Sequence, residues 1–176
     1  MRHALMVLAL LAALPAAAAG LTLASPDIAA ETTLKPAQVY RGGYGCNGGN
    51  LSPALSWSGE PAGTRSFALT VFDPDAPTGH GWWHWLVVDL PPTVHALPAG
   101  SPVPAGGLSL RNDFGTAGYG GACPPEGDTP HHYRFTVWAL KVPKLGVGAN
   151  ASADSVMAAL RANTLEKAEI TARYGR

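Results

Sequence analysis

Three segments of the chain place apolar side chains at every second position, which is the repeat of a β-strand with one buried face. They are residues 66–73 (SFALTVFD), 82–90 (WWHWLVVDL) and 131–140 (HHYRFTVWAL), and each is rich in β-branched and aromatic residues. A strand with an apolar face must bury that face against a second layer. The chain is therefore predicted to be a mostly β protein with a sandwich-like architecture.

The rest of the chain is rich in turns and ends in a helical pattern. It contains 21 Gly and 16 Pro, and residues 20–28 predict a short first strand. Residues 152–174 predict a C-terminal helix in which Ser152 is the N-cap and Val156, Leu160 and Leu165 lie on or near the buried side. A long Gly-Pro loop, residues 110–130, precedes the last predicted strand, and loops of this length are usually functional or disordered.

Residues 1–19 have the pattern of a secretory signal peptide. Arg2 and His3 precede an apolar run, and Pro15 and small residues ending near Ala19 follow it. The alternative is an uncleaved membrane anchor, but the apolar run is shorter than the ~18 residues that a span requires. We therefore expect a periplasmic or secreted protein with no stable membrane insertion after cleavage, in which residues 20–176 form a single domain.

Charge and cysteine content restrict the possible partners. The formal net charge is zero and Lys and Arg are not clustered, which argues against nucleic acid or an anionic membrane as a partner. The two cysteines, Cys46 and Cys123, favour a disulfide in an oxidising compartment; two buried free thiols are the alternative. With no C-x-x-C motif, a structural zinc site or a thioredoxin-like role is not expected.

Polar residues stand at the ends of the three predicted strands. Counting alternate positions, Asp73 ends the apolar row of Val71, and His131 begins the row of Tyr133. The same count puts His84 on the face of Trp82, Leu86 and Val88. If the first two strands are antiparallel neighbours and the third runs in the same direction as the second, all three residues meet at one end of the sheet.

One carboxylate and two imidazoles at a sheet end are suited to binding a small anion. In this prediction His84 and His131 donate hydrogen bonds, Asp73 orients an imidazole or keeps it protonated, and Tyr133 supplies a wall and a hydroxyl. The Gly-rich loop around Gly121 would supply backbone N–H groups. The simpler alternative is structural: Asp73 and Asp75 build Asx-turns, the histidines are satisfied core residues, and the tryptophans only fill the core.

Enzymatic readings find less support in the sequence. An Asp-His-His set could bind zinc, iron or manganese, but its spacing is not a compact ligand motif. No G-x-S-x-G nucleophile elbow occurs. We therefore expect no catalytic residue, metal or cofactor. Two alternatives stay open: an inhibitor or modulator of a protease or signalling protein, and a metal-dependent hydrolase.

Several motifs together resemble the phosphatidylethanolamine-binding protein (PEBP) family, in its bacterial Raf-kinase-inhibitor-like (YbhB/YbcL) branch. They are GGNLSPALSW, FDPDAPTGHGWWHWLVVDLP and GTAGYGGACPPEGDTPHHYRFTVWAL, in this order and spacing. The resemblance implies two antiparallel sheets in a Greek-key arrangement, with a pocket for phosphate-like headgroups or similar anions at one end. Carried over by motif, its ligand-binding residues are Asp73, His84, Gly121, Pro125, His131 and Tyr133. Trp83 stands where eukaryotic relatives commonly have a second histidine, which argues against their phospholipid preference and kinase inhibition.

Overall fold

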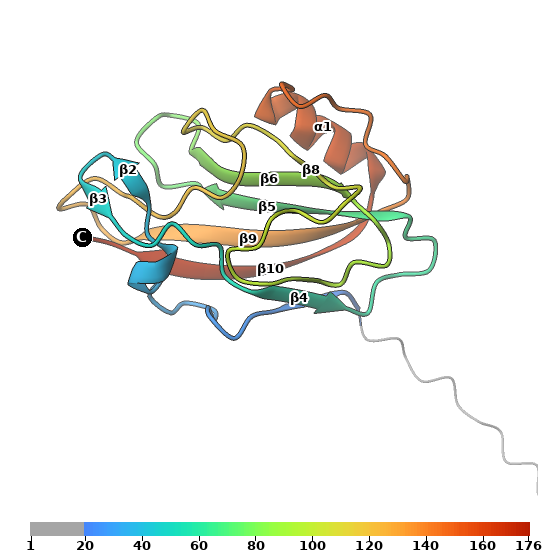
Figure 1. Ribbon diagram of the computed structural model, residues 1–176, viewed down its shortest axis with the longest axis horizontal. Coiled ribbons are helices and arrows are strands. Elements are labelled where there is room, and N and C mark those ends of the chain that lie inside the picture. Colours follow the sequence, from blue (N-terminus) through green and yellow to red (C-terminus); the bar gives the residue numbers. More distant parts are fainter. Residues whose placement is uncertain (1–19) are drawn as a thin grey trace, which may run out of the picture.

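The central element is a five-stranded sheet in which every neighbouring pair is antiparallel (Figure 1). This description comes from a computed structural model that describes residues 20–176. The strand order is β10 (Thr164–Tyr174), β9 (His131–Leu140), β5 (Ser66–Asp73), β6 (Trp82–Leu90) and β8 (Leu108–Ser109). The three strands predicted from alternating apolar residues form the middle of this sheet, which is where both faces are covered.

A smaller sheet packs on one face. It consists of β1 (Thr22–Ala24), β4 (Leu55–Ser58) and β7 (Ala96–Leu97); a separate hairpin contains β2 (Arg41–Gly43) and β3 (Cys46–Asn47) after a short 3-10 helix, Pro36–Gln38. The apolar rows predicted for β5 and β9 point into the space between the two sheets, where they meet Leu55, Trp57 and Leu97. The predicted mostly β, two-sheet antiparallel fold is confirmed.

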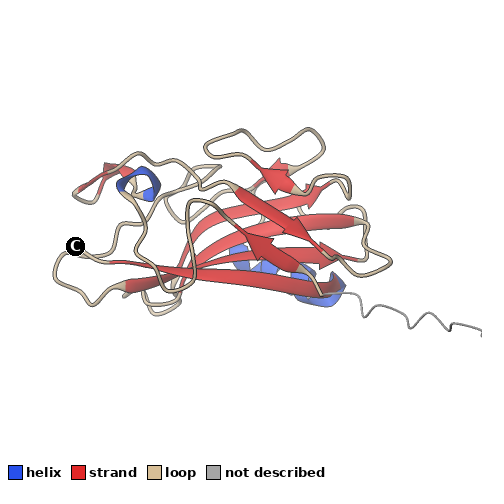
Figure 2. Ribbon diagram, turned by 90° about the horizontal axis from the view of Figure 1, so that it is seen from below, coloured by secondary structure: helices blue, strands red, loops and turns tan. Residues whose placement is uncertain are grey.

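The helix α1 (Ala153–Asn163) covers the other face of the five-stranded sheet, and it lies behind the strands in the view from below (Figure 2). Val156 and Leu160 are fully buried there against Leu86 and Val88. The predicted N-cap is confirmed, because the Ser152 side chain accepts a hydrogen bond from the Ser155 backbone N–H at 3.3 Å. A second apolar core therefore lies between α1 and the sheet.

The prediction of a helix is wrong for its second half, after Asn163. Residues Thr164–Tyr174 form strand β10, which pairs with β9 along its whole length. The sequence shows why: Ala168, Ile170, Ala172 and Tyr174 repeat with period two and pack on the core between the sheets. Leu165, predicted near the buried side, is 41% exposed. Pairing with a neighbouring strand outweighs the helical propensity of LEKAE, which is only a weak determinant.

The topology brings the three polar strand ends together. Strand β5 is antiparallel to both β6 and β9, so β6 and β9 run in the same direction. The end of β5 and the beginnings of β6 and β9 consequently lie at one end of the sheet, together with β2, β3 and the C-terminus (Figure 1). The condition that the sequence left open is satisfied.

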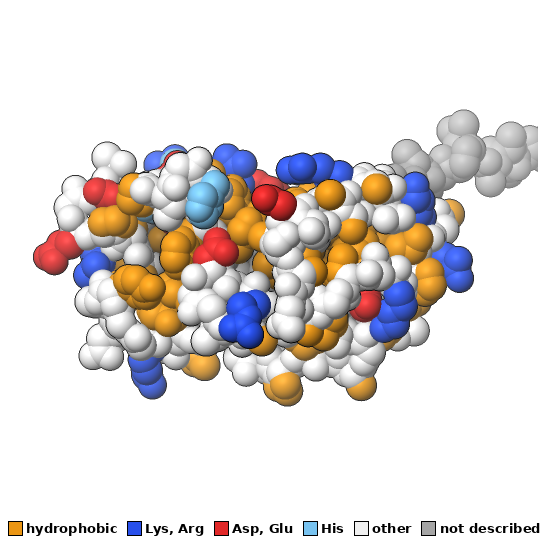
Figure 3. All heavy atoms as spheres, turned by 90° about the horizontal axis from the view of Figure 1, so that it is seen from above, with side chains coloured by type: hydrophobic (Ala, Val, Ile, Leu, Met, Phe, Trp, Pro, Cys, Tyr) orange, Lys and Arg blue, Asp and Glu red, His pale blue; other side chains and the backbone are white. Residues whose placement is uncertain are grey.

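The signal peptide predicted for residues 1–19 lies outside the described residues. Within residues 20–176, no helix has the length and apolar character needed to cross a membrane. Acidic and basic side chains are interspersed on the face seen from above, and they do not form a patch of one sign there (Figure 3).

Candidate functional site

A β-bulge at the beginning of β6 aims His84 toward the space between the sheets. Val71 pairs with Trp85 and Phe72 with Trp83, so β6 has one residue more than β5 over this stretch. Simple alternation had put His84 on the face of Leu86 and Val88, and that assignment is wrong. Those two residues pack beneath α1, whereas the His84 ring lies edge-on against Tyr133, with the ring centroids 5.1 Å apart.

The hydrogen bonds of His84 determine which ring nitrogen carries the proton. Its Nδ1 lies 2.8 Å from the carbonyl oxygen of Gly120 and 3.1 Å from that of Gly121. Carbonyl oxygens only accept, so Nδ1 is the protonated nitrogen and donates to them. Burial lowers the pKa of His84, although the Gly120 carbonyl partly opposes this. The ring is therefore neutral at neutral pH, with a lone pair on Nε2, and this atom is buried with no hydrogen-bond partner among residues 20–176.

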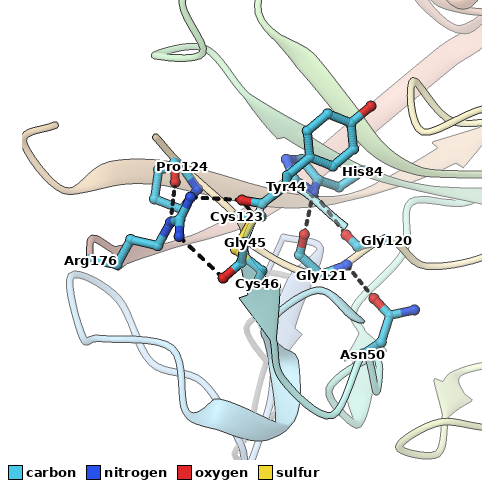
Figure 4. The surroundings of a disulfide bond; sticks show 10 residues. All are labelled: Tyr44, Gly45, Cys46, Asn50, His84, Gly120, Gly121, Cys123, Pro124 and Arg176. Carbon is cyan, nitrogen blue, oxygen red and sulfur yellow. Dashed lines mark hydrogen bonds between the residues drawn. A yellow bond between two sulfur atoms is a disulfide. The ribbon is translucent and has the colours of Figure 1, made fainter. Parts of the chain in front are cut away.

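The Gly-rich loop contributes the carbonyls of Gly120 and Gly121 to the site, and the N–H groups of these two residues already have acceptors (Figure 4). The Gly121 N–H donates to Asn50 Oδ1 at 2.8 Å, and the Gly120 N–H donates to the His84 carbonyl oxygen at 2.8 Å. The prediction that amides around Gly121 would receive an anion is therefore wrong. The role of Gly121 in this structure is to hold the His84 ring from behind.

Asp73 and His131 form a buried pair beside His84. Asp73 Oδ2 lies 2.8 Å from His131 Nδ1, and both side chains are 3% exposed. The other oxygen, Asp73 Oδ1, accepts a hydrogen bond from the Asp75 N–H at 2.8 Å, so Asp73 also builds the Asx-turn considered from the sequence. On the far side of the imidazole, Asp128 Oδ2 lies 3.5 Å from His131 Nε2. Asp73 thus fixes the orientation of the His131 ring.

These side chains line a cavity of about 140 Å³. Of the residues predicted for the site, Asp73, His84, Pro125 and His131 line it, and Trp82 forms part of its wall as expected. Sequence reasoning missed the remaining lining residues, which are Tyr44, Ala76, Pro77, Thr78, Phe114, Cys123 and Pro124. Two ring nitrogens of this lining are buried without a hydrogen-bond partner among the described residues: His84 Nε2 and Trp82 Nε1. The cavity therefore combines an apolar wall with unsatisfied polar atoms.

Tyr133 and Gly121 stand behind the cavity lining. Tyr133 is 1% exposed, and burial and the charge of Asp73 raise the pKa of its hydroxyl, which stays protonated. Its ring supports the His84 ring, as the predicted wall would require, but the residue is not part of the lining. Its contact with the lining is through the His84 ring.

An aromatic cluster closes one side of the cavity. Phe114 stacks on Tyr40 with ring centroids 4.0 Å apart and also contacts Trp82 and His84, at 5.4 Å each. Tyr44 lies at the rim and is 66% exposed. Phe114 occurs within the long loop, where the loop length was the available signal, and nothing in the sequence pattern pointed to Tyr44.

The disulfide between Cys46 and Cys123 is present, and Cys123 lines the cavity. It ties the segment that carries Tyr44 to the Gly-Pro loop. Arg176 adds to this connection, because its guanidinium donates to the carbonyl oxygens of Tyr44 at 2.8 Å and Pro124 at 2.7 Å (Figure 4). The rim of the cavity is thus held together by residues from three distant parts of the chain.

The described residues do not provide the set of metal ligands that a metal-dependent hydrolase would need. Within residues 20–176, no group of three or more His, Cys, Asp and Glu side chains is arranged to hold a metal ion. His84 Nδ1 and His131 Nδ1 are both engaged in protein hydrogen bonds.

Small-molecule sites in proteins are commonly concave cavities with apolar and aromatic walls, and this two-sheet antiparallel fold has such a cavity at its strand ends. The model of the phosphatidylethanolamine-binding protein family matches residues 24–175, and the chain belongs to this family. It is 53% identical over 165 residues to the UPF0098 protein YbcL of Escherichia coli K12, covering 90% of each chain. It is 45% identical over 157 residues to the UPF0098 protein YbhB of the same organism, covering 86% of this chain and 98% of that one.

The comparison of structures agrees with the sequence comparison. The crystal structure of E. coli YbcL, described as a new member of the mammalian PEBP family, superposes with a TM-score of 0.86 at 52% identity. The match covers 90% of this chain and 99% of that one. The family resemblance inferred from the sequence motifs is confirmed.

Proposed function

We propose that the protein is a non-enzymatic binding protein whose cavity holds a small oxyanion, either inorganic phosphate or the phosphomonoester of a headgroup. The observation that carries this proposal is a pair of buried ring nitrogens in one cavity, Trp82 Nε1 and His84 Nε2, which have no hydrogen-bond partner among residues 20–176. A ligand that pairs with both relieves the cost of leaving them unsatisfied, about 1–3 kcal/mol for each buried polar group. The indole N–H is a donor, which an anionic oxygen accepts.

A proton must accompany the anion. His84 Nε2 has a lone pair in the free protein, and so does an anionic oxygen. The two atoms can therefore form a hydrogen bond only if a proton lies between them. The proton comes either with a monoprotonated phosphate group or from solvent, by protonation of the imidazole. A bound anion raises the pKa of His84, so binding is strongest below the pKa of the free protein and weakens as pH rises through the pKa of the complex.

Isothermal titration calorimetry tests this function. Inorganic phosphate and glycerol 3-phosphate are titrated at pH values of about 5.5 and about 8, on either side of the ordinary histidine range. We expect tighter binding at the lower pH and, in buffers of different ionisation heat, net uptake of protons on binding. Equal affinities at the two pH values with no proton uptake contradict the proposed role of His84.

Two variants separate this proposal from a role in modulating another protein. His84→Gln keeps a donor toward Gly120 but cannot take up a proton. It is expected to remove the part of the pH dependence that comes from the imidazole and to leave only the part that comes from the ionisation of the phosphate itself. The exposed His80→Gln is the matched control and is expected to bind like the unmodified protein. If both variants bind phosphate weakly and alike, the protein-modulator alternative becomes the better reading.

We also propose that residues 1–19 are an export signal and that residues 20–176 are the mature binding domain in the periplasm or outside the cell. The disulfide supports this, because such bonds persist in oxidising compartments. Cell fractionation with mass spectrometry of the purified protein tests it. The expected result is a periplasmic or secreted protein that starts near Gly20 with the disulfide intact, and a cytoplasmic full-length chain overturns it.

A further inference from the structure

A second cavity, of about 260 Å³, lies outside the proposed anion site. Three loop segments form its walls, residues 50–52, 100–103 and 117–119, and the strand residues Trp85 and Ser109 complete its lining. None of the described residues that line it also lines the anion cavity. Its volume is slightly below the range of ~300–1,000 Å³ that is common for pockets of drug-sized ligands, so it suits a smaller molecule.

Two polar atoms of this lining are unsatisfied. Trp85 Nε1 and Ser109 Oγ are buried and have no hydrogen-bond partner among residues 20–176. Trp85 as a whole is 3% exposed, so bulk water does not take the place of a partner. An indole N–H can only donate, and the group that satisfies it must therefore be an acceptor. The serine hydroxyl can donate to the same acceptor or accept from the ligand.

The remaining lining excludes charge and favours a short apolar group. None of the described residues in this lining is Asp, Glu, Lys, Arg or His. A charged ligand would lose its hydration there without gaining an opposite charge. Leu51, Pro102 and Val103 supply apolar surface, and Leu51 is 49% exposed, which is high for a leucine side chain.

We propose that this cavity, which we call the neutral cavity, binds a small uncharged molecule that has a carbonyl oxygen, as an ester or amide does, and a short aliphatic part. The acceptor oxygen pairs with Trp85 Nε1 and Ser109 Oγ, and the aliphatic part contacts the side chains of Leu51, Pro102 and Val103. This site is independent of the oxyanion site, so either proposal can fail while the other stands.

The test uses two probes that differ by one methyl group and, as a result, in charge. N-acetylalanine methyl ester is neutral, and N-acetylalanine carries a carboxylate at neutral pH. Each is titrated into the ¹⁵N-labelled full mature chain, and the indole N–H resonances are followed after assignment by single Trp→Phe variants. We expect the ester to shift the Trp85 indole resonance along a saturable curve. Neither N-acetylalanine nor inorganic phosphate should do so, and phosphate should shift Trp82 instead.

Internal controls make the result decisive. The Trp57 indole N–H is also buried without a partner among the described residues, but Trp57 lies in the core and outside this lining, so its resonance should not move. Ser109→Ala should weaken ester binding by about three- to tenfold, because one hydrogen bond is lost. Ser56→Ala is the matched control, since Ser56 is an exposed residue of β4 that does not line this cavity.

Three outcomes overturn the proposal. The first is the absence of a saturable shift at Trp85, which would mean that the neutral cavity holds only water. The second is an equal shift at Trp57, which would indicate a general solvent effect. The third is an equal response to the ester and the carboxylate, which would contradict selection against charge.

Discussion

At the scale of single residues, the two cavity histidines have different hydrogen-bonding states. His84 donates through Nδ1 to two backbone carbonyls and leaves Nε2 unpartnered among the described residues, whereas His131 has a carboxylate near each ring nitrogen. An anion at His131 Nε2 must compete with Asp128, whose side chain is 42% exposed and belongs to a loop. Asp128 is therefore expected to oppose anion binding.

Replacing Asp128 tests this competition. Asp128→Asn removes a negative charge near the cavity with almost no change in shape. We expect inorganic phosphate to bind about two- to fivefold more tightly, which is the size expected for a partly exposed charge pair. Calorimetric titration at low salt measures it, and Glu126→Gln, a charge removal at an exposed site on the same loop, is the control. Unchanged or weaker binding in Asp128→Asn would show that the anion does not approach His131 Nε2.

The buried His84 also makes stability depend on pH. Its pKa is lowered in the folded protein by burial, while in the unfolded chain it is near the ordinary value of about 6.5. The unfolded chain therefore binds the proton first as the pH falls. The contribution of neutral His84 to the free energy of unfolding is therefore fully present above about pH 6.5. It is lost progressively as the pH falls toward the pKa of His84 in the folded protein.

Urea unfolding at a series of pH values measures this effect. We expect the free energy of unfolding to decrease below pH ~6.5 by at most about 1.4 kcal/mol per pH unit from this group. In His84→Gln this component should be absent, and His80→Gln should retain it. An identical pH slope in the unmodified protein and in His84→Gln would rule out His84 as the source.

At the scale of elements, a bulge in a strand and a close contact between two backbone segments determine how the His84 side chain is oriented. The extra residue in β6 turns His84 toward the cavity, and Gly121 holds it from behind through its carbonyl. Gly121 is glycine because the loop passes directly over the segment after the 3-10 helix. A Cβ at this position would overlap the backbone atoms of Val39 and Tyr40. The close approach of these two backbones positions the carbonyl that orients His84.

Gly121→Ala should therefore be severely disruptive. The overlap is with backbone, which cannot move aside as a flexible side chain can, and we expect a loss of about 2–3 kcal/mol in unfolding free energy. Gly148→Ala is the matched control, because a Cβ there meets no atom within 4 Å. It should change stability by no more than about 0.5 kcal/mol. Thermal or urea unfolding decides; a Gly121→Ala protein as stable as the control would contradict the packing argument.

At the scale of the whole molecule, distant segments close the cavity rim. Cys46 and Cys123 are 77 residues apart in the chain, and Arg176 reaches the carbonyls of Tyr44 and Pro124 next to them. The disulfide limits the freedom of the unfolded chain and holds Tyr44 near the Gly-Pro loop in the folded one. Its removal should affect both stability and ligand binding.

The double variant Cys46→Ala/Cys123→Ala tests both effects. We expect a loss of about 2–5 kcal/mol in unfolding free energy, the range typical for removing a native disulfide. Phosphate affinity should also decrease, because the rim segment is no longer tied to the loop. Unfolding with and without reductant provides the comparison, and the variant itself should not respond to reductant. A variant with unchanged stability would contradict a structural role for the bond.

Local patterns in the sequence were sufficient for much of the fold. The apolar rows of β5 and β9, the Ser152 cap, the candidate residues Asp73 and His131, and the family motifs were all readable, because each depends on neighbouring residues or on regular alternation. The second half of the predicted helix was not readable in this way. Its period-two row became decisive only when β9 was available as a partner for β10.

Other features depended on the tertiary structure alone. Alternation assigned His84 to the wrong face because a bulge is defined by the pairing of two strands and leaves no regular signal in one of them. The Gly121 N–H was expected to bind an anion, but Asn50, 71 residues away, already accepts its hydrogen bond. The sequence by itself determined which side chains were available and where each strand ended. Only the packed structure decided which of their polar atoms had found partners, because those partners come from remote parts of the chain.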